Sequence, residues 1–276
     1  MSVTQSQAVS AAFDAIAARY DETFTSSMIG QAQRAAVWGE LATTFRAGER
    51  VLEFGCGTGI DACFLAERGV QVVACDASSE MIQMLTRRVE HTGLENLVQP
   101  RVLGAEHIAS LQPHELFDGA FSNFGAINCV EDLGKLANDL AQCLKPGATA
   151  LLCWMGPYCL WEQSWYLLQG RRDKAFRRLK REGVQARIAD GVFVHIHYSS
   201  VEFLTRVFAL AFRLKSVRGI GVAVPPSYLE NWAHRHPNLL QICERVDSWL
   251  GRCPGTRLLG DHVLVRLQRE RRFGGD

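Results

Sequence analysis

The feature that most restricts the fold is a glycine-rich turn between a short apolar segment and a helix. Arg50–Phe54 has the length of one buried strand and stops at the run GCGTG, residues 55–59. Helical spacing follows at once, at Ala62, Leu65 and Ala66. Glycines at a strand end let the backbone turn through φ values that other residues avoid, and let a ligand approach the main chain closely. The segment therefore predicts a strand, a ligand-binding turn and a helix.

The alternation of strand and helix continues along the chain. Two leading helices are predicted within residues 5–45. Further strands are predicted at 70–75, 98–103, 117–122 and 148–154, with helices at 78–91 and 131–144. Parallel neighbours need a crossover that is usually helical, so this spacing favours βαβ units. We expect an α/β fold with a doubly wound, Rossmann-like, mostly parallel sheet.

Beyond Trp154 the pattern is less regular. It predicts a helix at 161–182, a hairpin of 184–188 and 192–198, a helix at 200–211, an extended segment at 212–224, helices near 227–235 and 238–250, and a strand at 261–268. An insertion after the fifth strand stands at the carboxyl edge of a doubly wound sheet, where the ligand crevice opens. We expect residues 1–154 plus about 256–276 to form the cofactor-binding domain. About 155–255 would form a helical and hairpin substrate lid and the remaining sheet elements.

Composition excludes several classes of partner. Thirty basic against 29 acidic residues leave a net charge of +1, so no strong overall field attracts nucleic acid or an anionic membrane. The nine cysteines form no Cys-x-x-Cys pair, and no secretion signal or long apolar span is visible. We expect a cytoplasmic protein, monomer or homodimer, with no metal, nucleic-acid or membrane partner. The basic run at 171–181 is interpreted as a solvated helix face or a rim for an anionic substrate.

A second motif residue indicates which ligand the turn binds. Asp76 closes the second predicted strand, 23 residues after Glu53, where a carboxylate can accept both hydroxyls of a ribose. The dinucleotide pattern G-x-G-x-x-G fails from Gly55. Its relaxed form, ending in alanine, is met by Gly57, Gly59 and Ala62. A nucleoside is predicted, and glycine spacing alone leaves a pyridine nucleotide open.

Together these segments resemble the class I S-adenosylmethionine-dependent methyltransferases of the small-molecule branch. Residues 51–59 are similar to the first family motif, 72–81 to the second, and 144–147 to the turn before the fifth strand, while 13–21 resemble the leading-helix signature. The resemblance covers about residues 10–155. It implies an enzyme (EC 2.1.1.-) that moves a methyl group from S-adenosyl-L-methionine to O, N, C or S of a small-molecule acceptor by in-line displacement, releasing S-adenosyl-L-homocysteine.

The resemblance also implies a cofactor site. Its members are Tyr20, Glu53, Gly55, Gly57, Gly59, Asp76, Ala77, Met81, Ala105, Glu106 and Asn123. The glycines would lie under the methionine portion, Glu53 would organise its charged end, and Asp76 would hold the ribose. Gly104 stands where the family often has an acid that bonds adenine. Main-chain groups at Ala105 and Glu106 are expected to replace that contact.

The acceptor side is predicted from position in the chain. Asn128 lies in the loop after the fourth strand, and Trp154 and Trp161 either wall a substrate pocket or attach the lid. His195 and His197 fall on one face of a predicted strand, because side chains alternate along it. His197 is a candidate general base, needed only if the nucleophile arrives protonated. A metal site would need a third ligand that no motif supplies.

Two other functions remain open at this stage. One is an NAD(P)-dependent oxidoreductase, because the relaxed glycine pattern is met. The other is a non-catalytic cofactor-binding scaffold protein, in which the fold serves regulation or assembly. Calorimetry with S-adenosylhomocysteine and NAD side by side distinguishes the first alternative. Cofactor binding without turnover over a broad acceptor panel would favour the second.

Overall fold

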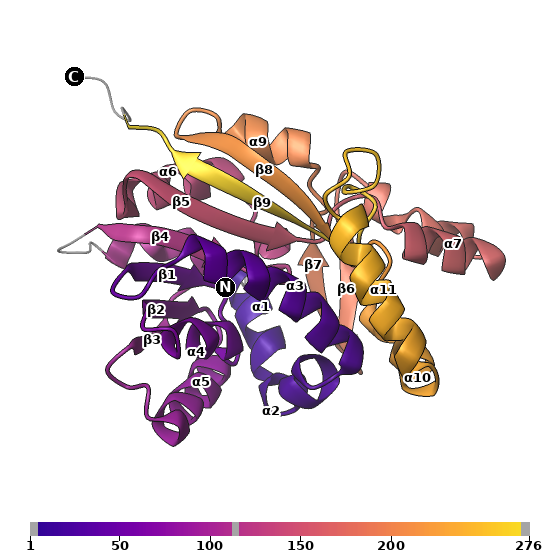
Figure 1. Ribbon diagram of the computed structural model, residues 1–276, viewed down its shortest axis with the longest axis horizontal. Coiled ribbons are helices and arrows are strands. Elements are labelled where there is room, and N and C mark those ends of the chain that lie inside the picture. The colour runs from indigo at the N-terminus through magenta and orange to yellow at the C-terminus, as the bar shows by residue number, and fades with distance from the viewer. Residues whose placement is uncertain (1–4, 112–115, 272–276) are drawn as a thin grey trace.

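The computed structural model describes residues 5–111 and 116–271. A seven-stranded sheet of order β3-β2-β1-β4-β5-β9-β8 runs through it (Figure 1). The strands are β1 (Arg50–Phe54), β2 (Gln71–Asp76), β3 (Val98–Val102), β4 (Phe117–Ser122), β5 (Leu144–Trp154), β8 (Phe212–Ile220) and β9 (His262–Arg269). Within this described sheet β9 alone runs opposite to the other strands. The predicted doubly wound, mostly parallel fold is confirmed.

Helices cover both faces of the sheet because side chains alternate along each strand. Val51 packs under α3 (Met28–Thr44), α4 (Ile60–Ala66) and α5 (Ser79–Thr92). Leu52 faces the other core, which α6 (Leu133–Cys143) and α9 (Val201–Phe208) complete. Short 3-10 turns, η2 (Ala105–Leu111) and η3 (Ala126–Cys129), follow β3 and β4. The carboxyl ends of the parallel strands therefore meet at one edge.

The N-terminal segment and a distant hairpin pack against each other. The chain begins its described part with α1 (Gln5–Asp14), α2 (Ala17–Tyr20) and the π-helical turn η1 (Asp21–Thr25), and the hairpin consists of β6 (Val184–Ala189) and β7 (Val192–Ile196). Ala12 of α1 contacts the core formed by Val194 and Ile196 of β7. This hairpin was predicted from the sequence, and its docking on α1 was not.

The segment between β5 and the hairpin differs from the prediction. The single helix expected at 161–182 is wrong, because the chain forms α7 (Leu160–Leu168), α8 (Arg172–Ala175) and the turn η4 (Arg177–Leu179). Gly170, at φ +70°, lies between α7 and α8. Its left-handed backbone breaks the helical path. Figure 1 shows α7 extending away from the sheet.

The last helices pack at the side of α3. They are η5 (Ser227–Leu229), α10 (Glu230–Arg235) and α11 (Pro237–Leu250). Leu240 of α11 and Ala233 of α10 share a small core with Ile29. None of the helices in the described ranges is long and apolar enough to cross a membrane. All nine cysteines are free thiols.

Candidate functional site

One cavity of about 600 Å³ opens at the carboxyl edge of the sheet. It runs from the glycine turn after β1 to the hairpin β6–β7. The sequence-predicted residues that line it are Tyr20, Gly55, Gly57, Asp76, Ala77, Met81, Ala105, Glu106 and Asn123. The structure thus brings most of the expected cofactor site together. Two expected members, Glu53 and Gly59, do not line the cavity.

The glycines of the turn have different roles. Gly57 has φ +53°, and a Cβ there would meet only the Tyr20 ring, at 3.9 Å, so its outer side is open to the cavity. A Cβ on Gly59 would collide with the Leu85 Cδ1 at 2.0 Å. Gly59 is therefore required for packing of α4 on α5. Gly57 is the position where a ligand can approach the main chain.

Asp76 joins the ends of β1 and β2. Its carboxylate accepts hydrogen bonds from the backbone N–H of Gly57 at 2.8 Å and of Ser78 at 2.9 Å. Burial raises the pKa of Asp76, and these backbone N–H groups oppose that effect. The carboxylate is held at the cavity wall, where its remaining lone pairs are available to ligand hydroxyls.

Glu53 lies behind the turn and is almost fully enclosed. It is 1% exposed, and its Oε2 atom has no hydrogen-bond partner among the described residues. Burial raises its pKa well above the usual value, and the Arg34 guanidinium works in the opposite direction. An enclosed acceptor without a donor is costly unless a ligand supplies one. Glu53 is therefore an enclosed carboxyl behind the turn with one oxygen left without a donor from the residues that the structure describes.

Asn123 positions the segment that follows β4. Its Nδ2 donates to the Asp61 Oδ2 at 2.9 Å and its Oδ1 accepts from the Phe124 N–H at 3.0 Å. Asp61 is itself fixed by Arg34, whose Nη1 donates to it at 2.6 Å. Phe124 has φ +47°, a left-handed conformation that a bulky residue rarely adopts. The amide of Asn123 thus stabilises a strained residue at the cavity wall.

Four rings follow one another along the cavity. Tyr20 lies 6.0 Å from Phe24, Phe24 lies 5.2 Å from Phe124, and Phe124 meets His262 edge to face at 5.3 Å. All four line the cavity. Burial raises the pKa of Tyr20 to about 12, so its hydroxyl keeps its proton. This aromatic row connects the glycine turn to the far end of the cavity.

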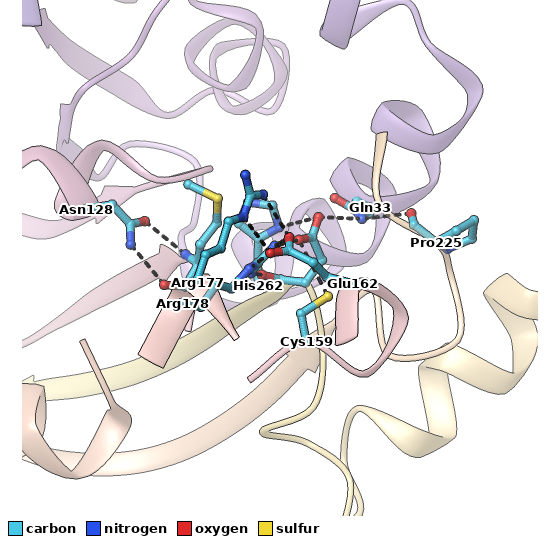
Figure 2. A network of polar contacts seen from close by, with 10 residues as sticks. Gln33, Asn128, Cys159, Glu162, Arg177, Arg178, Pro225 and His262 are labelled. Atoms are coloured by element: carbon cyan, nitrogen blue, oxygen red, sulfur yellow. Dashed lines mark hydrogen bonds and ion pairs between the residues drawn. The ribbon is translucent and has the colours of Figure 1, made fainter. Parts of the chain in front are cut away.

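The far end holds a buried ion cluster that the sequence did not predict. Arg178 donates through Nη2 to the Glu162 Oε2 at 2.9 Å and to the Asp261 Oδ1 at 2.7 Å (Figure 2). Arg177 donates through Nε to the Glu162 Oε1 at 2.7 Å. All four side chains contribute to the cavity lining. Of the two interpretations of 171–181, the solvated helix face is therefore wrong for Arg178, which is 5% exposed.

The rest of the lining is mainly apolar. Its apolar members from α1, the loops after β4 and β5, and the hairpin are Val9, Phe13, Ile16, Cys129, Val130, Met155, Ala186, Ile188, Val194 and Ile196. Phe13 and Ile16 belong to the leading-helix signature, and no pattern identified the others beforehand, because they come from elements that only the tertiary fold brings together. The cavity thus has a polar end at the glycine turn, an apolar chamber and the ion cluster of its far end.

The predicted acceptor residues lie elsewhere. Asn128 is enclosed and clamps the backbone, since its Nδ2 donates to the Met155 and His197 carbonyls at 2.9 and 2.7 Å. Trp154 is 0% exposed and belongs to the sheet core. Trp161 donates to the Ala223 carbonyl at 3.0 Å. None of the three lines the cavity, and the two tryptophans serve to attach the elements that follow β5.

The two hairpin histidines also face away from the cavity. Val194 and Ile196 line it, so by the alternation of the strand His195 takes the opposite face, and His197 lies beside it with ring centroids 4.7 Å apart. Burial and His195 lower the pKa of His197. Nowhere in the described ranges do three His, Cys, Asp or Glu side chains gather as metal ligands. The expected base, His197, therefore does not line the cavity.

Comparisons with known proteins agree with this geometry. Residues 51–147 match a family model described as a methyltransferase domain. A demethylmenaquinone methyltransferase of Clavibacter sepedonicus is 33% identical over 145 residues, which are 52% of this chain and 57% of that protein. The chain therefore spans little more than half the length of this curated relative.

Solved structures share the fold over nearly the whole chain. The DhpI-SAH complex structure matches with a TM-score of 0.62 and 18% identity, covering 99% of this chain and 100% of that one. The [4+2]-cyclase SpnF matches with a TM-score of 0.64 and 17% identity, covering 98% of each chain. At these identities the likeness shows the fold alone.

The observed residues fit the cofactor of this family. Gly57 leaves room for a ligand against the main chain, Asp76 offers acceptors to sugar hydroxyls, and Glu53 keeps an enclosed oxygen without a donor, within the described ranges, behind the turn. The family match favours this cofactor over the pyridine nucleotide. Residues 51–147 thus form a methyltransferase domain like that of the class I S-adenosylmethionine-dependent methyltransferases, and this match supports S-adenosylmethionine as its cofactor.

Proposed function

We propose that this protein transfers a methyl group from S-adenosylmethionine to a small, mainly apolar acceptor by in-line displacement. One observation carries the proposal: a single cavity joins the glycine turn and Asp76 to an apolar chamber bounded by α1 and the hairpin β6–β7. Donor and acceptor can therefore occupy one enclosed space. Ligand sites in proteins have this size and this mixture of apolar walls and few polar groups.

The chain contributes chiefly by positioning. The bound sulfonium supplies an already activated methyl group. Asp76 orients the ribose, Gly57 lets the donor lie against the main chain, and Phe124 marks the passage from the donor end to the chamber. Holding two reactants in line supplies on the order of 7–11 kcal/mol of a barrier. The chain therefore needs few chemical groups at the reacting centre.

The acceptor is inferred from the lining of the chamber. Phe13, Ile16, Met155, Val194 and Ile196 provide apolar walls, and the guanidiniums of the far end are paired with carboxylates. The cavity must hold the donor as well, so the acceptor is small. We infer that the hairpin and α1 cover it and exclude water, which is the role expected of a substrate lid.

Calorimetry and a turnover assay test the function in two steps. The protein should bind S-adenosylhomocysteine and not NAD. Methyl transfer from radiolabelled S-adenosylmethionine is then measured with a panel of small phenols, amines and thiols. Transfer to a member of the panel supports the proposal. Tight S-adenosylhomocysteine binding with no turnover over the panel would favour the scaffold alternative. The turnover assay is necessary because a cyclase shares this fold, so the fold alone does not determine the reaction.

A further inference from the structure

A buried imidazole ends the row of rings that lines the cavity from Tyr20 through Phe124. His262, the first residue of β9, is 5% exposed and lines the cavity. Its ring touches the Phe124 ring at a centroid distance of 5.3 Å. Phe124 comes directly after the Asn123 amide that fixes the end of the β4 loop. An antiparallel strand begins at the edge where the parallel strands end, and this topology brings His262 to the site.

The orientation of the ring follows from its contacts. In the described part of the chain, His262 Nδ1 is enclosed and has no hydrogen-bond partner, and it lies 3.5 Å from the Asp261 Oδ2. The edge that carries Nε2 is therefore the one that borders the cavity. Asp261 is fixed by Arg178 at 2.7 Å and by the Gln33 Nε2 at 3.3 Å. Hydrogen bonds of this kind are often long without ligand and tighten when the site is filled.

The charged groups around the imidazole balance one another, so burial sets the direction of its pKa. The carboxylates of Glu162 and Asp261 face the guanidiniums of Arg177 and Arg178, so the formal charges of the cluster cancel (Figure 2). Burial lowers the pKa of His262, partly opposed by Asp261. Burial also raises the pKa of the remaining ionisable neighbours, Cys159, Tyr198 and Tyr228. Near neutral pH His262 can therefore accept a proton.

We propose that His262 is the general base for an acceptor hydroxyl and that Asp261 is its positioning residue. The proposal rests on the proposed methyl transfer and narrows it to apolar molecules with a phenolic or enolic hydroxyl. The hydroxyl proton passes to Nε2 while an oxygen lone pair forms the bond to the methyl carbon. The carbon–sulfur bond breaks and its electron pair stays on sulfur. The imidazolium formed then loses its proton to solvent.

Nitrogen NMR tests the assignment without knowledge of the acceptor. In the full chain with S-adenosylhomocysteine, long-range ¹⁵N–¹H spectra of labelled histidines are recorded from pH 5 to 9, and His262→Gln identifies the resonances. The expected result is a neutral ring above pH 6.5 with the proton on Nδ1, and a changed tautomer in Asp261→Asn. A proton on Nε2, or a charged ring across this range, overturns the proposal whether or not the cofactor binds.

Kinetics separates a base from a structural histidine. With phenols, His262→Gln should lower kcat by about 10²-fold or more while S-adenosylhomocysteine affinity stays within about twofold. With thiophenols, which are ionised near neutral pH and need no base, the same variant should keep most of its kcat. His91→Gln, on the surface of α5, is the matched control. An equal loss of kcat with phenols and thiophenols overturns the proposal, and so does a loss of phenol methylation in His197→Gln alone. If the unaltered protein does not bind S-adenosylhomocysteine, the proposed function is refuted instead.

Discussion

The Asp76 carboxylate accepts the Gly57 N–H at 2.8 Å, so the acid that closes β2 is tied to the turn that closes β1. This bond links two positions that lie 19 residues apart. In the proposed donor site, one carboxylate would both shape the main-chain cradle and face the sugar hydroxyls. Donor binding would then depend on a contact within the protein as well as on contacts with the ligand.

Replacing Asp76 by alanine should weaken S-adenosylhomocysteine binding. The loss is expected at about 1–3 kcal/mol, because the ligand hydroxyls and the Gly57 N–H would lack their acceptor. Isothermal titration calorimetry measures it. Asp118→Ala is the matched control, since Asp118 accepts the Arg50 N–H at 2.9 Å and is remote from the cavity. Unchanged affinity in Asp76→Ala would refute the ribose assignment.

Alanine at Gly57 and at Gly59 should give opposite phenotypes. Gly59→Ala places a methyl group 2.0 Å from Leu85 and should lower stability by roughly 2–5 kcal/mol through strain and overpacking. Gly57→Ala meets open space in the protein, so it should cost roughly 1–2 kcal/mol of stability. Its methyl group should nevertheless reduce S-adenosylhomocysteine affinity about tenfold or more. Thermal unfolding measures the stability of both variants, and calorimetry measures their S-adenosylhomocysteine affinity. The prediction is contradicted if the ratio of affinity loss to stability loss is the same in both variants.

Glu53 should make the ligand-free protein less stable as pH rises. Its folded-state pKa is raised well above the ordinary 4.5, so the folded protein retains a proton that the unfolded chain releases. The contribution of Glu53 to the free energy of unfolding is then complete below pH 4.5 and falls as pH rises toward the folded-state pKa. Glu53→Gln should remove this slope and raise the Tm at pH 8 by about 2–4 °C, while weakening S-adenosylhomocysteine binding. A variant whose Tm at pH 8 is lower than that of the unaltered protein would show that the buried carboxyl is not destabilising.

Removing the central cation of the far-end cluster should destabilise the fold. Arg178→Met leaves the Glu162 and Asp261 carboxylates buried without their shared partner, which costs roughly 3–5 kcal/mol and lowers the Tm by about 10 °C or more. Arg206→Met is the control, because its pair with Glu202 is solvent-exposed and should shift the Tm by only about 1 °C. Differential scanning calorimetry compares the two. Similar small shifts would mean that the cluster contributes nothing to stability.

Local patterns were sufficient to predict the sheet and the donor end of the cavity. Arg50–Phe54 and residues 117–122 have the strand bounds expected from their apolar runs, and Asp76 closes β2 as expected. Such features depend on residues close in sequence, on turn chemistry and on the period of the side chains. They are readable without knowledge of tertiary contacts.

The acceptor end could not be predicted in this way. Arg178 pairs with Glu162, 16 residues away, and with Asp261, 83 residues away, so its burial depends on the arrangement of three separate elements. His195 and His197 were correctly expected to share one face of the strand. Nothing local indicates that this is the face turned away from the cavity. His262 reaches the cavity only because β9 lies beside β5.

Because β9 runs in the reverse direction, the end of the chain returns to the cavity edge of the sheet. The proposed donor-binding residues and the proposed acceptor-binding residues therefore lie mainly in different parts of the chain. The family match ends at residue 147, whereas His262 and the ion cluster all come from later residues. If the proposed methyl transfer holds, substitutions after residue 147 can therefore change the acceptor without disturbing how the donor is held. Grafting residues 148–276 onto a related donor-binding domain is thus a rational route to new acceptor preferences.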